Sequence, residues 1–151
     1  MLKGINPLLN AEVLHALRAM GHGDHLIVAD TNFPSDAIAR QTRLGRLLRI
    51  DNVTAADAVA AILSLMPLDT FIDNAAQRME IVDAPDELPP VQQEVQKAVD
   101  ASQGRNWPMT SIERFAFYEH AKSAYCVIQT GERRFYGCFS FTKGVLPPDA
   151  D

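Results

Sequence analysis

Leu26-Ile27-Val28-Ala29-Asp30 is the stretch of sequence that decides the fold. Its four apolar residues follow one another without interruption between His25 and Asp30, and such a run is typical of a strand buried on both faces of a sheet. A strand of this kind predicts an α/β protein with helices on both sides of the sheet. Because ligands in such folds bind outside the carboxyl ends of the strands, the pattern directs attention to Asp30 and the loop after it.

Helical and extended segments alternate along the rest of the chain. Before the central strand, apolar residues at helical spacing predict a helix over Ala11–Met20, with Asn10 as its N-cap and Gly21 at its end. The alternation predicts a three-layer α/β sandwich in which a mainly parallel sheet is flanked by helices. The other predicted helices are Thr54–Met66, Val91–Ala101 and Phe115–Ala124, and the other predicted strands are Leu44–Ile50, Met79–Val82, Tyr125–Gln129 and Phe135–Phe141.

The bulk composition is that of a globular chain, and its 151 residues predict one domain over residues 1–151. The net charge of −5 and the lack of a basic run argue against nucleic acid as a partner. No apolar run approaches the roughly 20 residues that a membrane span needs, and Met1–Ile5 lacks the apolar core of a signal peptide. Cys126 and Cys138 match no zinc pattern and lie in apolar stretches, so we expect buried thiols in a cytoplasmic protein.

The densest polar cluster is Gly21-His22-Gly23-Asp24-His25. Histidine is the side chain whose ordinary pKa suits proton transfer near neutral pH, so His22, between two glycines, is a candidate general acid/base. The alternative is a surface histidine in a loop that ends a helix. His22 and His25 with Asp24 or Asp30 also suggest a metal site, but no third or fourth ligand is spaced to suit one, and we predict no metal.

Three further residues have groups suited to a polar ligand. Asp30 either caps the following loop or accepts hydrogen bonds from ligand hydroxyls. Arg114 presents a rigid fork of donors to a sugar oxygen, or it pairs on the surface with Glu113 or Glu119. Tyr136 offers a flat apolar face and one polar tip, which suits a sugar and equally suits packing within a sheet.

Several common catalytic motifs are missing from the sequence. It contains no glycine-rich nucleotide loop, no G-x-S-x-G and no H-E-x-x-H. The usual sequence signatures of nucleotide-cofactor binding, serine hydrolysis and zinc proteolysis are therefore missing. Asp83, Asp86 and Glu87 form the main acidic concentration. They lie in a proline-rich turn, which is more typical of a solvated surface than of the paired carboxylates of a glycosidase.

Short motifs follow one another in order from residue 1 to about residue 147. They are Met1-Leu2-Lys3, Ile5, Pro7-Leu8, Met20–Asp24, Asp30, Phe33-Pro34, Arg114–Glu119, Thr130–Arg133, Tyr136-Gly137 and Lys143–Val145. This ordered set resembles the RbsD/FucU family of bacterial sugar mutarotases and pyranases, and the segment from Arg40 to Arg105 matches less well. The run Arg-Phe-Ala-Phe-Tyr-Glu over Arg114–Glu119 resembles the L-fucose mutarotase branch rather than the ribose branch.

The resemblance implies a fold, an assembly and a set of site residues. It implies an α/β fold, no metal or organic cofactor, and a ring-like homo-oligomer, commonly a decamer, with sites between adjacent subunits. The family's catalytic histidine falls on His22, its sugar-binding aspartate on Asp30 and its sugar-binding arginine on Arg114. The family's binding tripeptide, usually Tyr-Gly-Asn in the fucose branch, falls on Tyr136, Gly137 and Cys138. If the side chain at position 138 contacts sugar, replacing the amide by a thiol loses a hydrogen bond.

The resemblance therefore implies an isomerase that interconverts anomeric or ring forms of a free monosaccharide, with L-fucose or a related sugar as substrate. Mutarotation needs one proton removed from the anomeric hydroxyl and one delivered to the ring oxygen, which a single acid/base such as His22 can support. Three alternatives stay open: a non-catalytic monosaccharide-binding protein linked to sugar uptake or regulation, a metal-dependent enzyme that uses His22 and His25, and a structural subunit of a ring.

Overall fold

The strand β1 (His25–Ala29) lies inside a six-stranded sheet, as its apolar sequence predicts, in a computed structural model that describes residues 1–150. The strand order is β2-β5-β1-β6-β3-β4. Only β6 runs antiparallel to its neighbours β1 and β3, so the sheet is mixed and mainly parallel. The other strands are β2 (Leu48–Ile50), β3 (Ala76–Met79), β4 (Thr110–Ile112), β5 (Cys126–Thr130) and β6 (Phe139–Thr142).

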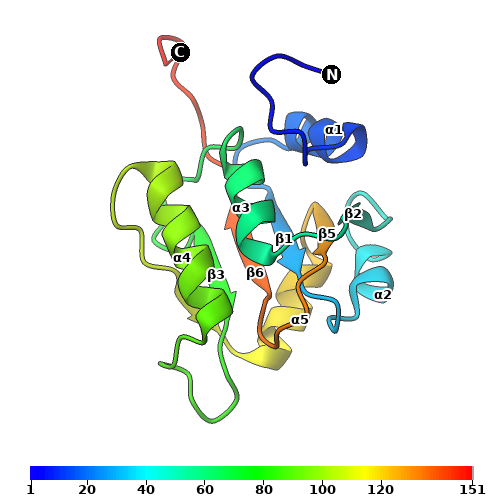
Figure 1. Ribbon diagram of the computed structural model, residues 1–151, viewed down its shortest axis with the longest axis vertical. Coiled ribbons are helices and arrows are strands. Elements are labelled where there is room, and N and C mark those ends of the chain that lie inside the picture. Colours follow the sequence, from blue (N-terminus) through cyan, green and yellow to red (C-terminus); the bar gives the residue numbers. More distant parts are fainter. Residues whose placement is uncertain (151) are drawn as a thin grey trace.

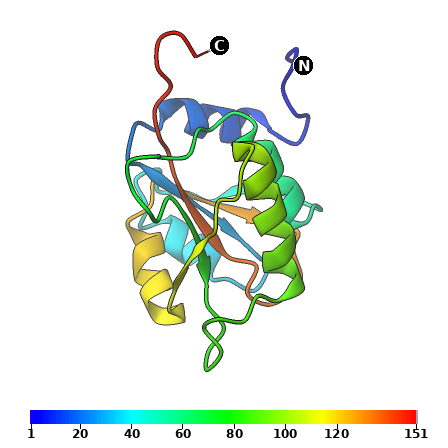
Figure 2. The same ribbon diagram turned by 90° about the vertical axis from the view of Figure 1, so that its left-hand side faces the viewer.

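Helices cover both faces of the sheet, which confirms the predicted α/β sandwich (Figure 1). Figure 2 shows the sheet between the two helical layers. Leu26 and Val28 of β1 pack in the first layer, and Ile27 and Ala29, which alternate with them, pack in the second. The first layer holds α1 (Ala11–Ala19), α3 (Ala55–Leu63) and α4 (Pro90–Gln103), and the second holds α2 (Ser35–Ala39) and α5 (Arg114–Lys122).

Capping residues explain where the predicted helices begin. The Asn10 side chain accepts a hydrogen bond from the Val13 N–H at the start of α1, and Thr54 does the same for Asp57 at the start of α3.

Among residues 1–150, no helix is long and apolar enough to cross a membrane.

Three predicted strands have wrong bounds, and two short elements were not predicted. Instead of starting at Leu44, β2 starts at Leu48, because the chain turns at Gly45, which has a positive φ of 76°. Instead of covering Met79–Val82, β3 ends at Met79, because the chain turns at Asp83, which has a positive φ of 64°. The final strand starts only at Phe139, because Tyr136 has a φ of 62° and cannot continue an extended strand. The short elements α2 and β4 contain five and three residues, too few for hydrophobic periodicity to indicate them.

Candidate functional site

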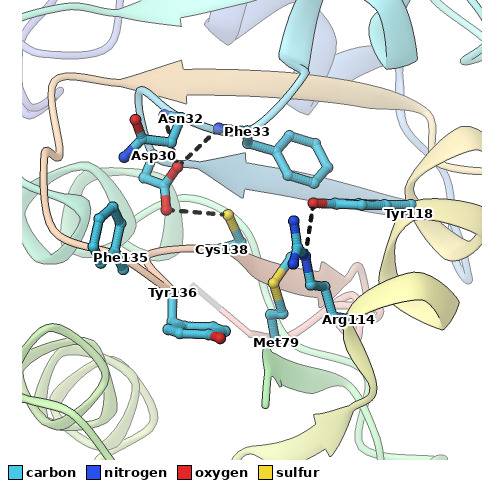
Figure 3. Close-up of a pocket in the computed structure, with 9 residues that line it drawn as sticks. All are labelled: Asp30, Asn32, Phe33, Met79, Arg114, Tyr118, Phe135, Tyr136 and Cys138. Carbon is cyan, nitrogen blue, oxygen red and sulfur yellow. Dashed lines mark hydrogen bonds between the residues drawn. The ribbon is translucent and has the colours of Figure 1, made fainter. Parts of the chain in front are cut away.

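A pocket of about 340 Å³ lies beyond the carboxyl end of β1, where the α/β rule places ligands. Figure 3 shows α5 on one side of this pocket and the loop after β1 on the other. Four predicted site residues therefore meet in one place, although they come from three separate segments of the chain. The lining residues are Asp30, Asn32, Phe33, Met79, Arg114, Tyr118, Phe135, Tyr136 and Cys138.

Asp30 connects two walls of the pocket through its carboxylate. Its Oδ1 accepts the backbone N–H groups of Asn32 and Phe33, both at 2.9 Å. Its Oδ2 accepts the Gly137 N–H at 3.1 Å and the Cys138 thiol at 3.5 Å (Figure 3). A carboxylate offers about four lone-pair positions, and this chain uses four of them itself. Asp30 is 3% exposed. Of the two roles considered from the sequence, the structure contains the capping role.

Gly137 and Cys138 form the part of the pocket wall that faces Asp30. A Cβ at position 137 would lie 2.9 Å from the Glu132 side chain and 3.2 Å from that of Asp30, so only glycine fits this close approach. The Cys138 side chain is buried, and burial together with the negative charge of Asp30 raises the pKa of this thiol well above its usual range. Cys138 is therefore a neutral thiol that donates to Asp30.

Arg114 and Tyr118 face the pocket from α5 and are hydrogen-bonded to each other. The Arg114 Nε donates to the Tyr118 hydroxyl at 3.1 Å, and this hydrogen bond raises the pKa of Arg114. Within residues 1–150 the expected alternative of a surface ion pair is not formed, since Glu113 caps α5 and Glu119 pairs with Lys122. Tyr118 was missed as a site residue, although its position four residues after Arg114 puts both on one helix face.

Tyr136 lies in the loop before β6, where it packs partly buried against the second layer of the core and also lines the pocket. Its left-handed backbone, with a φ of 62°, is unusual for a residue other than glycine and turns the side chain to the pocket (Figure 3). Gln92 donates its side-chain amide to the Tyr136 carbonyl at 3.0 Å. The Tyr136 hydroxyl accepts the Val82 N–H at 3.4 Å. Backbone strain at such a position is a common feature of functional sites.

His22 lies at the opposite end of the sheet from this pocket. It belongs to the loop of residues 21–24, which we call the histidine loop, and β1 separates it from Asp30. Five strand residues span roughly 16 Å, so the imidazole of one chain does not reach the pocket of the same chain. The His22 side chain is 45% exposed, and Figure 1 shows β1 running from the end near α1 and both termini to the far end of the molecule.

Asp69 is the partner of His22, and no pattern in the sequence indicated this pairing. Its Oδ2 lies 3.1 Å from the His22 Nε2, and its Oδ1 accepts the Phe71 N–H at 3.0 Å. The two residues are 47 positions apart, and only the tertiary structure brings the histidine loop beside residues 67–71, which we call the aspartate loop. A buried carboxylate next to an exposed imidazole orients the ring and selects its tautomer. The Phe71 ring stands at 75° to the imidazole, 5.6 Å away.

His25 is a structural residue and not a partner of His22. Its Nε2 lies 3.1 Å from the His120 carbonyl oxygen, and the His25 and His120 rings stack at 4.2 Å. Burial lowers the pKa of both histidines, that of His120 to about 4. The part of the chain that the structure describes contains no group of three or more His, Cys, Asp or Glu side chains that could hold a metal ion. The arrangement does not favour the metal-dependent alternative.

Comparisons with known proteins extend over almost the whole chain. The model of the RbsD / FucU transport protein family matches residues 3–146. The fucose mutarotase of Danio rerio is 39% identical over 154 residues, which cover 99% of this chain and 97% of that protein. The crystal structure of protein Atu2016, described as a candidate sugar-binding protein, is 65% identical, covers 97% of both chains and has a TM-score of 0.96. The fucose mutarotase of Streptococcus pneumoniae, solved with L-fucose, is 33% identical over 97% of this chain and 100% of that chain, with a TM-score of 0.86.

Proposed function

Because the chain belongs to the RbsD / FucU transport protein family, we propose that it is a sugar mutarotase. It interconverts the anomeric or ring forms of a free monosaccharide, with L-fucose or a related sugar as substrate. The observation that carries the proposal is that the candidate site residues lie at two ends of the sheet. One end has a pocket lined by groups suited to a sugar, and the other has an exposed imidazole with a buried carboxylate partner. None of the described residues that line the pocket is a histidine.

A second copy of the chain supplies the missing half of each site. Both ends present an exposed aromatic ring, since Phe135 at the pocket is 75% exposed and Phe71 beside His22 is 72% exposed. Exposed apolar groups of this kind mark surfaces that another chain covers. A contact between two different ends of identical chains repeats head to tail, and it closes into a ring when the rotation allows. We therefore propose a ring-like homo-oligomer, a decamer in keeping with the resemblance, with His22 of one copy at the pocket of the next.

The protein itself only has to transfer protons, because the ring opens and closes within the sugar. The imidazole takes the proton from the anomeric hydroxyl, the electron pair of that O–H bond forms the carbonyl as the bond from the anomeric carbon to the ring oxygen breaks, and the imidazolium returns the proton to the ring oxygen. The open-chain aldehyde then rotates about its first carbon–carbon bond, and the reverse steps close either anomer. With the Nε2–H of His22 donated to Asp69, the Nδ1 is the nitrogen that accepts the proton. General acid/base help of this kind contributes about 10²–10⁴-fold to the rate.

The pocket orients the sugar because its polar groups bind the sugar oxygens and its apolar groups contact the carbon–hydrogen face. The exposed guanidinium of Arg114 donates to sugar oxygens, with the hydroxyls of Tyr118 and Tyr136 beside it. Phe33 and Met79 offer apolar surface to the carbon–hydrogen face of the ring. In this proposal Asp30, Gly137 and Cys138 form the wall against which the sugar lies, and the Asp30 carboxylate fixes that wall.

The test is the exchange between α and β anomers, measured by NMR saturation transfer on L-fucose. We expect the protein to accelerate the exchange, and His22→Ala to abolish the acceleration while the sugar still binds. His15→Ala, which removes an exposed histidine of α1, is the matched control and should exchange at the wild-type rate. If His22→Ala accelerates the exchange as much as wild type does, His22 has no catalytic role. If wild type does not accelerate the exchange over buffer, the alternative of a sugar-binding protein is favoured.

A further inference from the structure

The segment Thr142–Gly144, which we call the exit segment because it leaves β6, lies between the two loops that hold the His22–Asp69 pair. On the side of the histidine loop, Lys143 makes two backbone hydrogen bonds. Its N–H donates to the carbonyl of Asp24 at 2.8 Å, and its carbonyl accepts the N–H of Gly23 at 2.9 Å. These bonds fix the backbone directly after the catalytic imidazole.

On its other side the exit segment is bonded to the aspartate loop. The Thr142 carbonyl accepts the Asp69 N–H at 3.0 Å, and the Gly144 N–H donates to the Pro67 carbonyl at 2.8 Å. A Cβ at position 144 would lie 2.5 Å from the carbonyl oxygen of Leu68, so the approach is too close for any residue but glycine. One extended segment thus sets the spacing between the loop of the imidazole and the loop of its carboxylate.

The Lys143 side chain holds the chain directly before the histidine loop, at the end of α1. Its ammonium donates to the carbonyls of Leu17 and Met20 at 2.7 and 2.6 Å. These carbonyls belong to the end of α1, where backbone acceptors lack helical partners and the helix dipole favours a cation. Met20 precedes His22 by two residues, so the ammonium anchors the chain directly before the histidine loop, while the Lys143 backbone anchors it directly after.

We propose that Lys143 is a positioning residue for the His22–Asp69 pair, an inference that rests on the proposed function. Without the ammonium, the end of α1 and the histidine loop can move relative to the aspartate loop, and the 3.1 Å contact between imidazole and carboxylate is no longer fixed. The sugar pocket lies at the other end of the sheet, so the loss affects turnover and not sugar affinity.

The test compares Lys143→Met with two matched variants. Lys143→Met keeps the aliphatic stem and removes the ammonium, and we expect kcat to fall about tenfold with KM unchanged, since a misplacement of 1 Å can cost roughly 10²-fold. Lys143→Arg restores two donors and should recover most of the rate. Arg18→Met removes a neighbouring positive charge that forms no hydrogen bond or ion pair within residues 1–150, and it should behave as wild type.

A spectroscopic readout separates positioning from general destabilisation. The ¹⁵N shifts of the imidazole report which nitrogen of His22 is protonated, with exposed His15 as the internal reference. We expect Lys143→Met to lose the preference for the Nε2–H tautomer, as we also expect of Asp69→Ala, which removes the acceptor, while Arg18→Met and Lys143→Arg should keep it. An unchanged tautomer preference in folded Lys143→Met, or an unchanged kcat, would overturn the inference.

Two further outcomes are also decided by this design. If Lys143→Met does not fold, Lys143→Gln, whose amide can donate to one of the two carbonyls, takes its place with the same expected readouts. If His22→Ala keeps full mutarotation, the catalytic role proposed for His22 fails, but the tautomer measurement still reports whether Lys143 holds the imidazole against Asp69. The failure of one proposal is therefore distinguishable from the failure of the other.

Discussion

The two ends of β1 are built in different ways. At the carboxyl end, one buried side chain, Asp30, holds the pocket walls together through hydrogen bonds to backbone N–H groups and a thiol. At the amino end, the backbone of the exit segment spaces two loops, and the polar pair itself is one contact between His22 and Asp69. The first end is a pocket wall held by one carboxylate, and the second presents one exposed imidazole in contact with another carboxylate. The pocket wall therefore depends on one buried side chain, whereas the position of the imidazole depends on the backbone of a neighbouring segment.

The largest effect is expected when two inactive variants, one defective at each end of β1, are mixed. His22→Ala retains an intact pocket and Arg114→Ala retains an intact histidine, so rings assembled from both contain some complete sites. An equal mixture should recover about a quarter of the wild-type exchange, because half of the pockets and half of the histidines are intact in a head-to-tail ring. Saturation transfer on L-fucose after joint refolding measures the recovery.

The control for mixing uses two variants that damage the same end. Arg114→Ala mixed with Tyr136→Ala provides intact histidines but leaves every pocket defective, so we expect no recovery beyond that of each variant alone. Failure of the first mixture to recover any activity, with both variants folded and assembled, would mean that His22 and the pocket do not meet between copies.

The sequence predicted one end of the molecule better than the other, for a physical reason. Residues that follow the carboxyl ends of strands converge in any α/β fold, so Asp30 could be assigned to a site from an apolar run alone. Asp69 could not be assigned to a site from the sequence, because its pairing with His22 depends on how the exit segment spaces two loops. No local sequence pattern encodes that spacing. The backbone of Tyr136 was missed for a similar reason: its left-handed geometry follows from contacts with Gln92 and the pocket wall.

Asp30→Ala tests the rigid end. The variant leaves the buried N–H groups of Phe33 and Gly137 without acceptors, and each such group costs about 1–3 kcal/mol. We expect the free energy of unfolding to fall by about 3 kcal/mol, with the tautomer of His22 unchanged at the other end. Asp36→Ala, at an exposed position in the adjacent α2, is the control and should change stability by about 0.5 kcal/mol or less. A loss near that of the control, measured by urea unfolding, would contradict the role given to Asp30.

Cys138 is the position where the pocket departs from the pattern that the resemblance implies, and its replacement should have the smallest effect. The thiol donates to Asp30 and is 2% exposed, so it contributes little to sugar binding. Cys138→Ser keeps a donor of similar size toward Asp30, and we expect its KM for L-fucose to match wild type. Cys138→Asn introduces an amide that is too large to stay behind Asp30 and reaches the sugar, so its KM should fall a few-fold, on the scale of one hydrogen bond of about 1 kcal/mol. If both variants have the same KM, the side chain at this position does not contact the sugar, and the backbone of Tyr136 and Gly137 is the part of the tripeptide that does.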